Sequence, residues 1–226
     1  MHFLNPTYLI SVLIAVSVHE WAHAMTADRL GDPTPGHAGR LTLNPLAHID
    51  LVGALMFLIV GFGWAKPVPI NSSYFRHPRQ GTAITALAGP FSNLCLAIIA
   101  FTALLFIAGG AQPESVFDLL SPLSGFAAGK TVFIQILQSS LFVNLALMAF
   151  NLFPIAPLDG SNILQMFIPY QYMSRYEDIM RVGPFILLFL IFFETFLPIH
   201  LLTGWVFGIM SVVLSIFTAV AGAIGL

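Results

Sequence analysis

Long apolar runs separated by short polar segments dominate the sequence. An α-helix needs roughly 20 apolar residues to cross a membrane at about 1.5 Å per residue, and each run is close to or above that length. The last run is long enough for two crossings, divided near Pro198-Ile199-His200. The pattern predicts five transmembrane helices, in the runs from about Leu4 to Ala27, Thr82 to Ala108, Lys130 to Leu152 and Gly183 to Leu226.

A shorter apolar stretch, Leu51 to Phe62, lies between the first two runs. It is too short to cross a membrane comfortably and predicts a re-entrant element. The segment Gly63 to Asn71 follows, and its two prolines, Pro67 and Pro69, exclude a helix or a central strand and favour an extended edge strand. Alternation of residue types over Arg40 to Leu43 predicts a second short strand.

We therefore expect an all-α polytopic membrane protein with about five transmembrane helices, a re-entrant element and short edge β-strands. Residues 1–226 are expected to form one domain, with a core at about 4–165 and a C-terminal helix pair at about 183–226. Composition agrees, because only 8% of the residues are charged and 58% are hydrophobic, whereas soluble domains carry about 25% charged residues. The lipid bilayer is thus an expected partner. The net charge of −2 argues against nucleic-acid binding.

The basic residues predict an orientation in the membrane. If residues 51–62 dip in and return, one face holds seven Lys and Arg residues and the other holds Lys130 alone; if they cross, the division is five to three. The positive-inside rule favours the first arrangement. We expect a prokaryotic cell (inner) membrane protein with its N-terminus outside and its C-terminus in the cytoplasm. No Lys or Arg precedes the first run, so no cleavable signal peptide is expected.

The first run contains the motif His19-Glu20-Trp21-Ala22-His23. Residues four apart lie on one helix face, so His19 and His23 can offer imidazole nitrogens to one metal ion. Glu20 can accept a proton from an activated water. The alternative is a helix with two hydrogen-bonded histidines. Ionisable groups inside a membrane segment cost about 2.5–3.5 kcal/mol each on insertion scales, which favours the metal interpretation.

Catalytic zinc usually has three protein ligands and one open position. Asp159 is the best candidate for the third ligand, because the predicted topology places it and His23 near the cytoplasmic ends of their segments. The turn before Gly160 can direct the Asp159 carboxylate back toward the bundle. Asp28 and Asp32 are closer in sequence, but they lie in a loop beyond the helix end. We expect one zinc ion per chain, on the cytoplasmic side.

Several other residues are candidates for substrate contacts. Asn93 and Asn151 lie in apolar helices and can donate to the substrate backbone or to an oxyanion. For Asn93, a role as a hydrogen-bonding link between helices is an equal alternative. The stretch that contains Lys66, Val68 and Ile70 can lend its edge to an unwound substrate. Its alternative role is to plug the end of the bundle.

Together these motifs resemble the site-2 protease family of intramembrane zinc metalloproteases. They occur in the family's order from residue 19 to about residue 165. One departs from the family pattern, because Pro157-Leu158-Asp159-Gly160 stands where Asn-Pro-Asp-Gly is usual; the spacing of the aspartate is kept. The motifs are His19 through His23, Gly31-Asp32, Gly39 through Pro45, Gly63 through Pro69, Ala88 through Asn93 and Asn151 through Gly160.

The resemblance implies zinc held by His19, His23 and Asp159, with Glu20 as the base. It also implies cleavage of transmembrane protein or peptide substrates, such as membrane-tethered regulators. The chain is similar to a minimal bacterial or archaeal member without a PDZ or nucleotide-sensing domain. Two rival functions remain open: a zinc transporter or channel, which would not need Glu20, and a non-catalytic relative that binds helices. Homo-oligomerisation also stays open.

Overall fold

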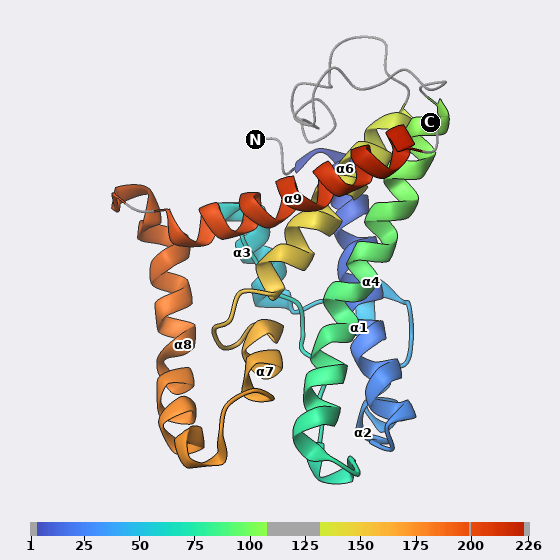
Figure 1. Cartoon of the computed structure of the whole chain (residues 1–226). Helices are drawn as coiled ribbons and strands as arrows, with labels where there is room; N and C mark the ends of the chain where they lie inside the picture. Colours follow the sequence, from blue (N-terminus) through green and yellow to red (C-terminus); the bar gives the residue numbers. More distant parts are fainter. Residues whose placement is uncertain (1–3, 108–131, 199, 224–226) are drawn as a thin grey trace.

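The computed structural model describes residues 4–107, 132–198 and 200–223 and is mostly helical (Figure 1). Within these ranges, four helices are long and apolar enough to cross a membrane: α1 (Pro6–Arg29), α4 (Pro78–Ile107), α6 (Val132–Asn151) and α9 (Leu201–Ala223). The other α-helices are α2 (Thr34–His37), α3 (Leu51–Val60), α7 (Asp159–Gln165) and α8 (Met173–Phe193). Short 3₁₀ turns lie at Pro45–Ala47, Ser72–Tyr74, Tyr170–Tyr172 and Glu194–Phe196.

Helices α1, α4 and α6 pack together as the centre of the bundle, and α9 lies across α6. α1 and α4 run in opposite directions (Figure 1). The buried apolar residues of α1 are small, namely Ala15, Ala22, Ala24 and Ala27, and small side chains let neighbouring backbones approach closely. A core of larger side chains joins α4, α6 and α9 and includes Phe101, Leu104, Leu141, Leu145, Met148, Met210 and Leu214.

The C-terminal region differs from the prediction of two crossings within residues 183–226. α8 begins at Met173, ten residues before the predicted Gly183, and includes four charged residues. One pair of these, Arg181 and Asp178, lies 3.3 Å apart and largely exposed. The apolar pattern could not locate this start, because a helix can continue through charged residues whose side chains reach water. The described residues thus contain four long apolar helices plus α8, and α9 runs at a steep angle to α8 (Figure 1).

The predicted edge strands are wrong. Across the described ranges, strand-like pairing is limited to one isolated antiparallel bridge between Ile49 and Ala65. Residues 40–43 form a bend, where the Thr42 carbonyl pairs with the His48 ring at 2.8 Å. Residues 66–71 are neither helix nor strand, and among the described residues no strand lies beside them. An extended backbone becomes a strand only when a second strand lies beside it, and sequence alternation alone does not supply one.

α3 has the dimensions of an element that enters a membrane without crossing it. Asp50 caps its first turn by accepting a hydrogen bond from the Gly53 N–H at 2.8 Å. Gly61 ends it with a φ of +82°, a left-handed conformation that glycine adopts without strain. Ten residues make a helix about 15 Å long, half the thickness of a membrane interior. The chain then folds back so tightly that a Cβ on Gly53 would lie 2.2 Å from the Trp64 carbonyl oxygen.

Because α1 and α4 are antiparallel neighbours, residues 30–77 leave and re-enter the bundle at one end. We predict that Leu43→Cys and Arg76→Cys, each in a Cys95→Ser background, will react with a membrane-impermeant maleimide from the same side. Both positions are exposed. Leu4→Cys, at the other end of α1, is the control for the opposite side. Labelling of positions 43 and 76 from opposite sides would show that residues 51–62 cross.

Candidate metal centre

Two histidines on α1 form one side of a compact polar cluster inside the bundle. α1 starts at Pro6, and Asn5 caps it by accepting a hydrogen bond from the Thr7 N–H at 2.9 Å. His19 and His23 lie one helical turn apart, with ring centroids 4.6 Å apart and planes nearly perpendicular. Both are buried, with 4% and 6% of their surfaces exposed. The predicted pairing of these two imidazoles on one helix face is confirmed.

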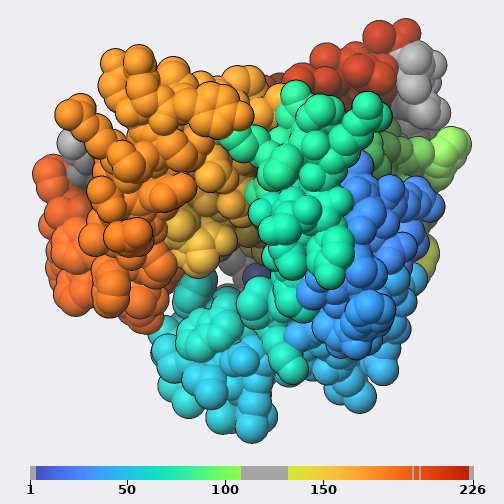
Figure 2. Space-filling view, turned by 90° about the horizontal axis from the view of Figure 1, so that it is seen from below, coloured from blue at the N-terminus to red at the C-terminus, as the bar shows by residue number. Residues whose placement is uncertain are grey.

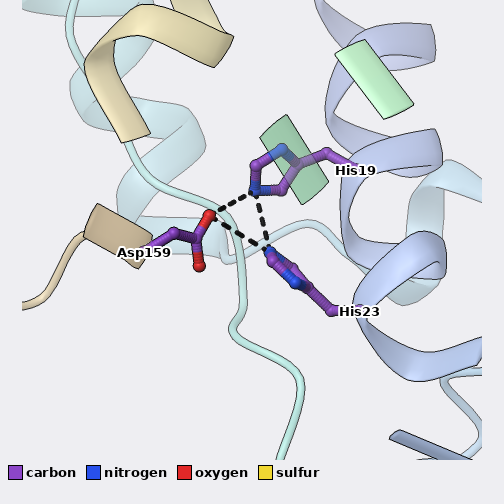
Figure 3. Close-up of side chains that lie close together, drawn as sticks. All are labelled: His19, His23 and Asp159. Atoms are coloured by element: carbon purple, nitrogen blue, oxygen red, sulfur yellow. Dashed lines mark hydrogen bonds and ion pairs between the residues drawn. The ribbon is translucent and has the colours of Figure 1, made fainter. Parts of the chain in front are cut away.

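Asp159 completes the cluster from the first residue of α7 (Figure 3). Its Oδ2 atom lies 3.3 Å from the Nε2 atoms of both His19 and His23, and those two nitrogens are 3.0 Å apart. The turn that brings Asp159 here requires Gly160, because a Cβ at that position would lie 2.3 Å from the carbonyl oxygen of Leu152. The three residues named from the sequence as a ligand set therefore meet in space.

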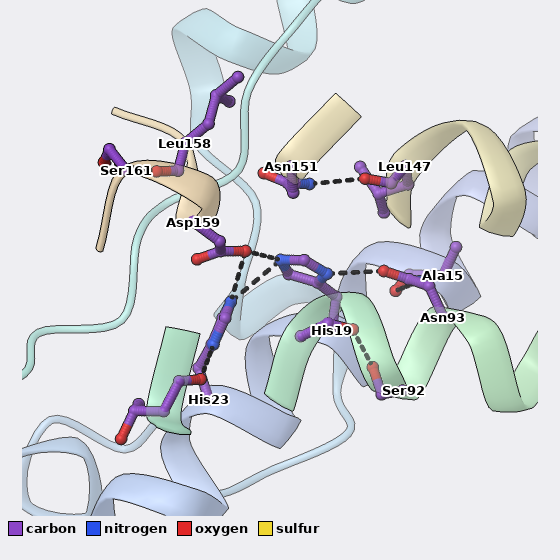
Figure 4. A network of polar contacts seen from close by, with 12 residues as sticks. Ala15, His19, His23, Ser92, Asn93, Leu147, Asn151, Leu158, Asp159 and Ser161 are labelled. Atoms are coloured by element: carbon purple, nitrogen blue, oxygen red, sulfur yellow. Dashed lines mark hydrogen bonds and ion pairs between the residues drawn. The ribbon is translucent and has the colours of Figure 1, made fainter. Parts of the chain in front are cut away.

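The outer nitrogens of the two rings show which way each imidazole is protonated. His23 Nδ1 lies 2.7 Å from the Thr85 carbonyl oxygen, and His19 Nδ1 lies 2.6 Å from Asn93 Oδ1 (Figure 4). Both partners are acceptors, so each Nδ1 carries the hydrogen. In a neutral imidazole the other nitrogen then has a free electron pair. In the neutral form of each ring, the Nε2 atom therefore presents a free electron pair to the centre of the cluster.

A buried chain of amides fixes the orientation of Asn93. Its Nδ2 donates to the Ala15 carbonyl at 3.2 Å and to Asn144 Oδ1 at 2.9 Å. Asn144 in turn donates to the Ser140 carbonyl at 2.8 Å. Because Nδ2 is committed to these two acceptors, Oδ1 must face His19. Asn93 and Asn144 are fully buried, so this chain ties α1, α4 and α6 together beside the histidines.

The cluster is suited to a cation. Its three inner atoms, two Nε2 and one carboxylate oxygen, are all electron-pair donors and can lie within 4.8 Å of one another. Asp159 Oδ2 is buried and receives no hydrogen bond from the described residues. A shared proton can satisfy one of the three close contacts, whereas a metal ion satisfies all of them. Two imidazole nitrogens and one carboxylate oxygen are also a ligand set of catalytic zinc sites.

The backbone of α4 forms the third wall of the cluster at Gly89. A Cβ on Gly89 would lie 2.4 Å from His23 Nε2 and 2.6 Å from His19 Nε2. No side chain larger than hydrogen fits there without moving the rings. By contrast, a Cβ on Gly204 in α9 would meet no atom within 4 Å. The close approach of α4 therefore depends on glycine at position 89.

A cavity of about 400 Å³ opens onto the cluster. Glu20 lines it beside His19, His23 and Asp159, and is partly exposed there. Seen from below, a hollow lies between α4, the region of α7 and the cyan residues that precede α4 (Figure 2). The arrangement can therefore place a water molecule or a substrate carbonyl against the inner atoms of the cluster, with a carboxylate at its side.

The residues predicted to contact substrate fall into two groups. Val68, Ile70 and Asn151 line the cavity. Asn151 Nδ2 donates to the Leu147 carbonyl at 3.0 Å (Figure 4), and Asn151 Oδ1 receives no hydrogen bond from the described residues. Asn93 and Lys66 do not line it. The position of Asn93 fits the helix-linking alternative, with His19 as one of its partners.

Two groups at the site were not expected from the sequence. The Thr85 carbonyl orients His23, and a pattern of side chains in the sequence cannot predict an acceptor that belongs to the backbone. Asn144 orients Asn93; an amide in an apolar helix is a visible signal, but its partner depends on how α4 and α6 pack.

Comparison with known proteins assigns the family. A model of peptidase family M50 matches residues 7–191. The chain is 34% identical over 217 residues to "Putative zinc metalloprotease YwhC" of Bacillus subtilis (strain 168), covering 96% of this chain and 93% of that protein. It is 28% identical over 204 residues to "Putative zinc metalloprotease Rip2" of Mycobacterium tuberculosis (strain H37Rv), covering 88% and 69%. No solved structure matches the chain.

The family match covers most of the chain and includes every residue of the cluster and its cavity. The relative YwhC is aligned over nearly the full length of both proteins. The chain therefore belongs to peptidase family M50, the site-2 protease family of intramembrane zinc metalloproteases.

Proposed function

We propose that this protease binds one zinc ion per chain through His19, His23 and Asp159, and hydrolyses peptide bonds in or near transmembrane segments of other membrane proteins. The convergence of three buried electron-pair donors, one of them Asp159 Oδ2 with no hydrogen-bond donor, carries the proposal. When bound there, zinc supplies Lewis-acid activation of water and of the scissile carbonyl. A zinc transporter or channel is not favoured by the family to which the chain belongs.

Glu20 is the proposed general base. It lines the cavity next to His19, and α1 holds both residues in fixed relation. As the water oxygen bonds to the carbonyl carbon, Glu20 takes the water proton. It then gives that proton to the amide nitrogen as the C–N bond breaks, so the products are a carboxyl group and an amine. Asn151, also in the cavity wall, is the proposed contact to substrate backbone or to the developing oxyanion.

The extended stretch at residues 66–70 is the proposed binding edge for an unwound substrate. Pro67, Val68 and Ile70 line the cavity. The N–H groups of Val68 and Ile70 form no hydrogen bond with any described residue, and the neighbouring Pro67 and Pro69 have no N–H. Unwinding a helix in lipid leaves backbone N–H and C=O groups without hydrogen bonds, at a cost of several kcal/mol for each group. Pairing with a free edge offsets part of this cost. Lys66 itself belongs to the support of this edge, since its N–H donates to the His48 carbonyl at 2.9 Å.

We also propose a prokaryotic cell (inner) membrane location with the metal centre toward the cytoplasm. The support is the concentration of Lys and Arg on the face that includes Arg29, Arg76, Arg79 and Arg175.

Glu20→Gln tests the catalytic proposal. We predict cleavage of a transmembrane substrate to fall about 10²–10⁴-fold, because glutamine cannot accept the proton, while zinc content stays at one per chain. Purified protein in lipid nanodiscs is assayed for product and for metal by mass spectrometry. Glu177→Gln, an exposed carboxylate on α8, is the control and should leave both unchanged. Full cleavage by Glu20→Gln would remove Glu20 from the mechanism.

Gly89→Ala tests the metal proposal. The added methyl group would displace both imidazoles, so we predict zinc affinity to fall about 10- to 100-fold or more. Affinity is measured by titrating metal-free protein against a chelating dye. Gly204→Ala makes the same change where space is open and should bind zinc normally. Equal affinities of the two variants would contradict a zinc site between His19 and His23.

Val68→Pro tests the binding edge by removing one N–H and leaving an extended backbone. One lost hydrogen bond corresponds to about a 2- to 10-fold decrease in kcat/KM, with zinc content unchanged. Val68→Ala keeps the N–H and serves as the matched control. Cleavage by Val68→Pro at the rate of Val68→Ala would mean that the Val68 N–H does not bind substrate.

A further inference from the structure

Within the described residues, the backbone of the stretch Pro67–Ile70 is fixed by hydrogen bonds at its two flanking residues. Before it, the Lys66 N–H donates to the His48 carbonyl at 2.9 Å. After it, the Asn71 N–H donates to Asp32 Oδ2 at 2.7 Å. The backbone N–H groups between these ends form no hydrogen bond within the residues that the structure describes. The hydrogen bonds that hold this stretch beside the metal centre are therefore those at its two ends.

Arg40 provides the first support. Its side chain is buried, and its Nη1 atom donates to the carbonyl oxygens of Ala47 and Lys66, the latter at 3.4 Å. Its own backbone N–H donates to the Pro35 carbonyl at 2.9 Å, in α2, which packs against α1. Arg40 thus connects the start of the stretch to the end of α1 through a short chain of contacts.

Asp32 provides the second support and is fully buried. Its Oδ1 accepts hydrogen bonds from the Thr34 N–H at 3.0 Å and hydroxyl at 2.5 Å, while Oδ2 accepts from Asn71. The Asp32 N–H donates to the Ala27 carbonyl at 3.0 Å, in the last turn of α1. Gly31, with a φ of +103°, makes the turn between them. Asp32 is therefore fastened directly to the end of α1.

The same helix carries His19, Glu20 and His23. An α-helix is a stiff rod with a rise of about 1.5 Å per residue, so its end stays at a constant distance from the metal ligands. A support fastened to that end transmits this distance to the stretch Pro67–Ile70. The metal ligands and the proposed substrate edge are in this way held by one rigid body.

Both supports are charged groups that the protein buries without an opposite charge. Among the described residues neither Asp32 nor Arg40 forms an ion pair. Burial alone would raise the pKa of the Asp32 carboxyl, but the hydrogen bonds from Thr34 and Asn71 outweigh it and lower the pKa below its ordinary value. Buried charges are tolerated where hydrogen bonds to them are made, and here those bonds go to the loop and to the two ends of the stretch.

We propose that Asp32 and Arg40 are positioning residues that set the place of the stretch Pro67–Ile70 relative to the metal centre, by fastening its two ends to the end of α1. The inference rests on the proposed function, in which this stretch pairs with the unwound substrate. It also gives a role to the motifs Gly31-Asp32 and Gly39-Arg40, for which neither the metal centre nor the cavity accounts. A reacting group misplaced by about 1 Å can cost about 10²-fold in rate, so the supports matter without touching substrate.

The test uses Asp32→Asn in the full-length, zinc-loaded protein in lipid nanodiscs. Asparagine is uncharged and has one acceptor oxygen where aspartate has two, so the Asn71 N–H loses its charged acceptor in either orientation of the side chain. We expect exchange of the Asn71 backbone amide to speed up about tenfold or more, since a bond to a charged acceptor is lost. We expect kcat/KM to fall about 10- to 100-fold while zinc content is unchanged. Cross-linking of substrate to Val68→Cys should fall in parallel.

Asp50→Asn is the matched control. Asp50 also accepts a backbone N–H bond in the same region, but it caps α3, and asparagine caps a helix equally well. If Asp32→Asn does not fold, Arg40→Met replaces it as the test variant. Methionine keeps the side-chain stem and loses the donors, and hydrogen exchange of the Lys66 backbone amide is then measured. Exchange and cleavage equal to those of Asp50→Asn would overturn the proposal. If the unsubstituted protein cleaves nothing, the protease assignment fails instead, and amide exchange still decides whether Asp32 holds the stretch.

Discussion

The bundle has to hold three electron-pair donors close together, namely the Nε2 atoms of His19 and His23 and Oδ2 of Asp159. Without a cation between them these three atoms repel one another. Helix geometry alone brings two imidazoles together on α1. The carboxylate of Asp159 must come from α7, so α4 and α6 have to pack closely enough to let the Asn151–Gly160 turn reach α1. Small residues on α1 and Gly89 on α4 permit that approach. The outer ring nitrogens are committed to Thr85 and Asn93, which directs the free electron pairs inward.

Much of this site could be predicted because it depends on short-range geometry. The four-residue spacing of His19 and His23 guarantees a shared helix face in any α-helix. Asp159 follows from its place in a proline-rich turn at the same end of the bundle as His23. The apolar runs that became α1, α4 and α6 were located to within a few residues, because a membrane interior demands an unbroken helix of a given length.

The errors and omissions concern features that depend on a partner. Residues 40–43 and 63–71 have strand-like sequences, but in the part of the chain that the structure describes no second strand lies beside them beyond the bridge between Ile49 and Ala65. The direction in which Asn93 points is decided by Asn144 on a different helix, and no local pattern encodes that pairing. The start of α8 was missed because charged residues ended the apolar pattern without ending the helix.

The amide chain from Ser140 through Asn144 and Asn93 to His19 has a thermodynamic consequence. It makes the association of α6 with α4 and the orientation of the His19 ring parts of one hydrogen-bonded system. Linkage between two such equilibria is reciprocal. The proposed metal binding would therefore strengthen the association of these helices by the same free energy by which helix association strengthens metal binding. In the proposed zinc complex, the metal would hold these helices together as well as activate water.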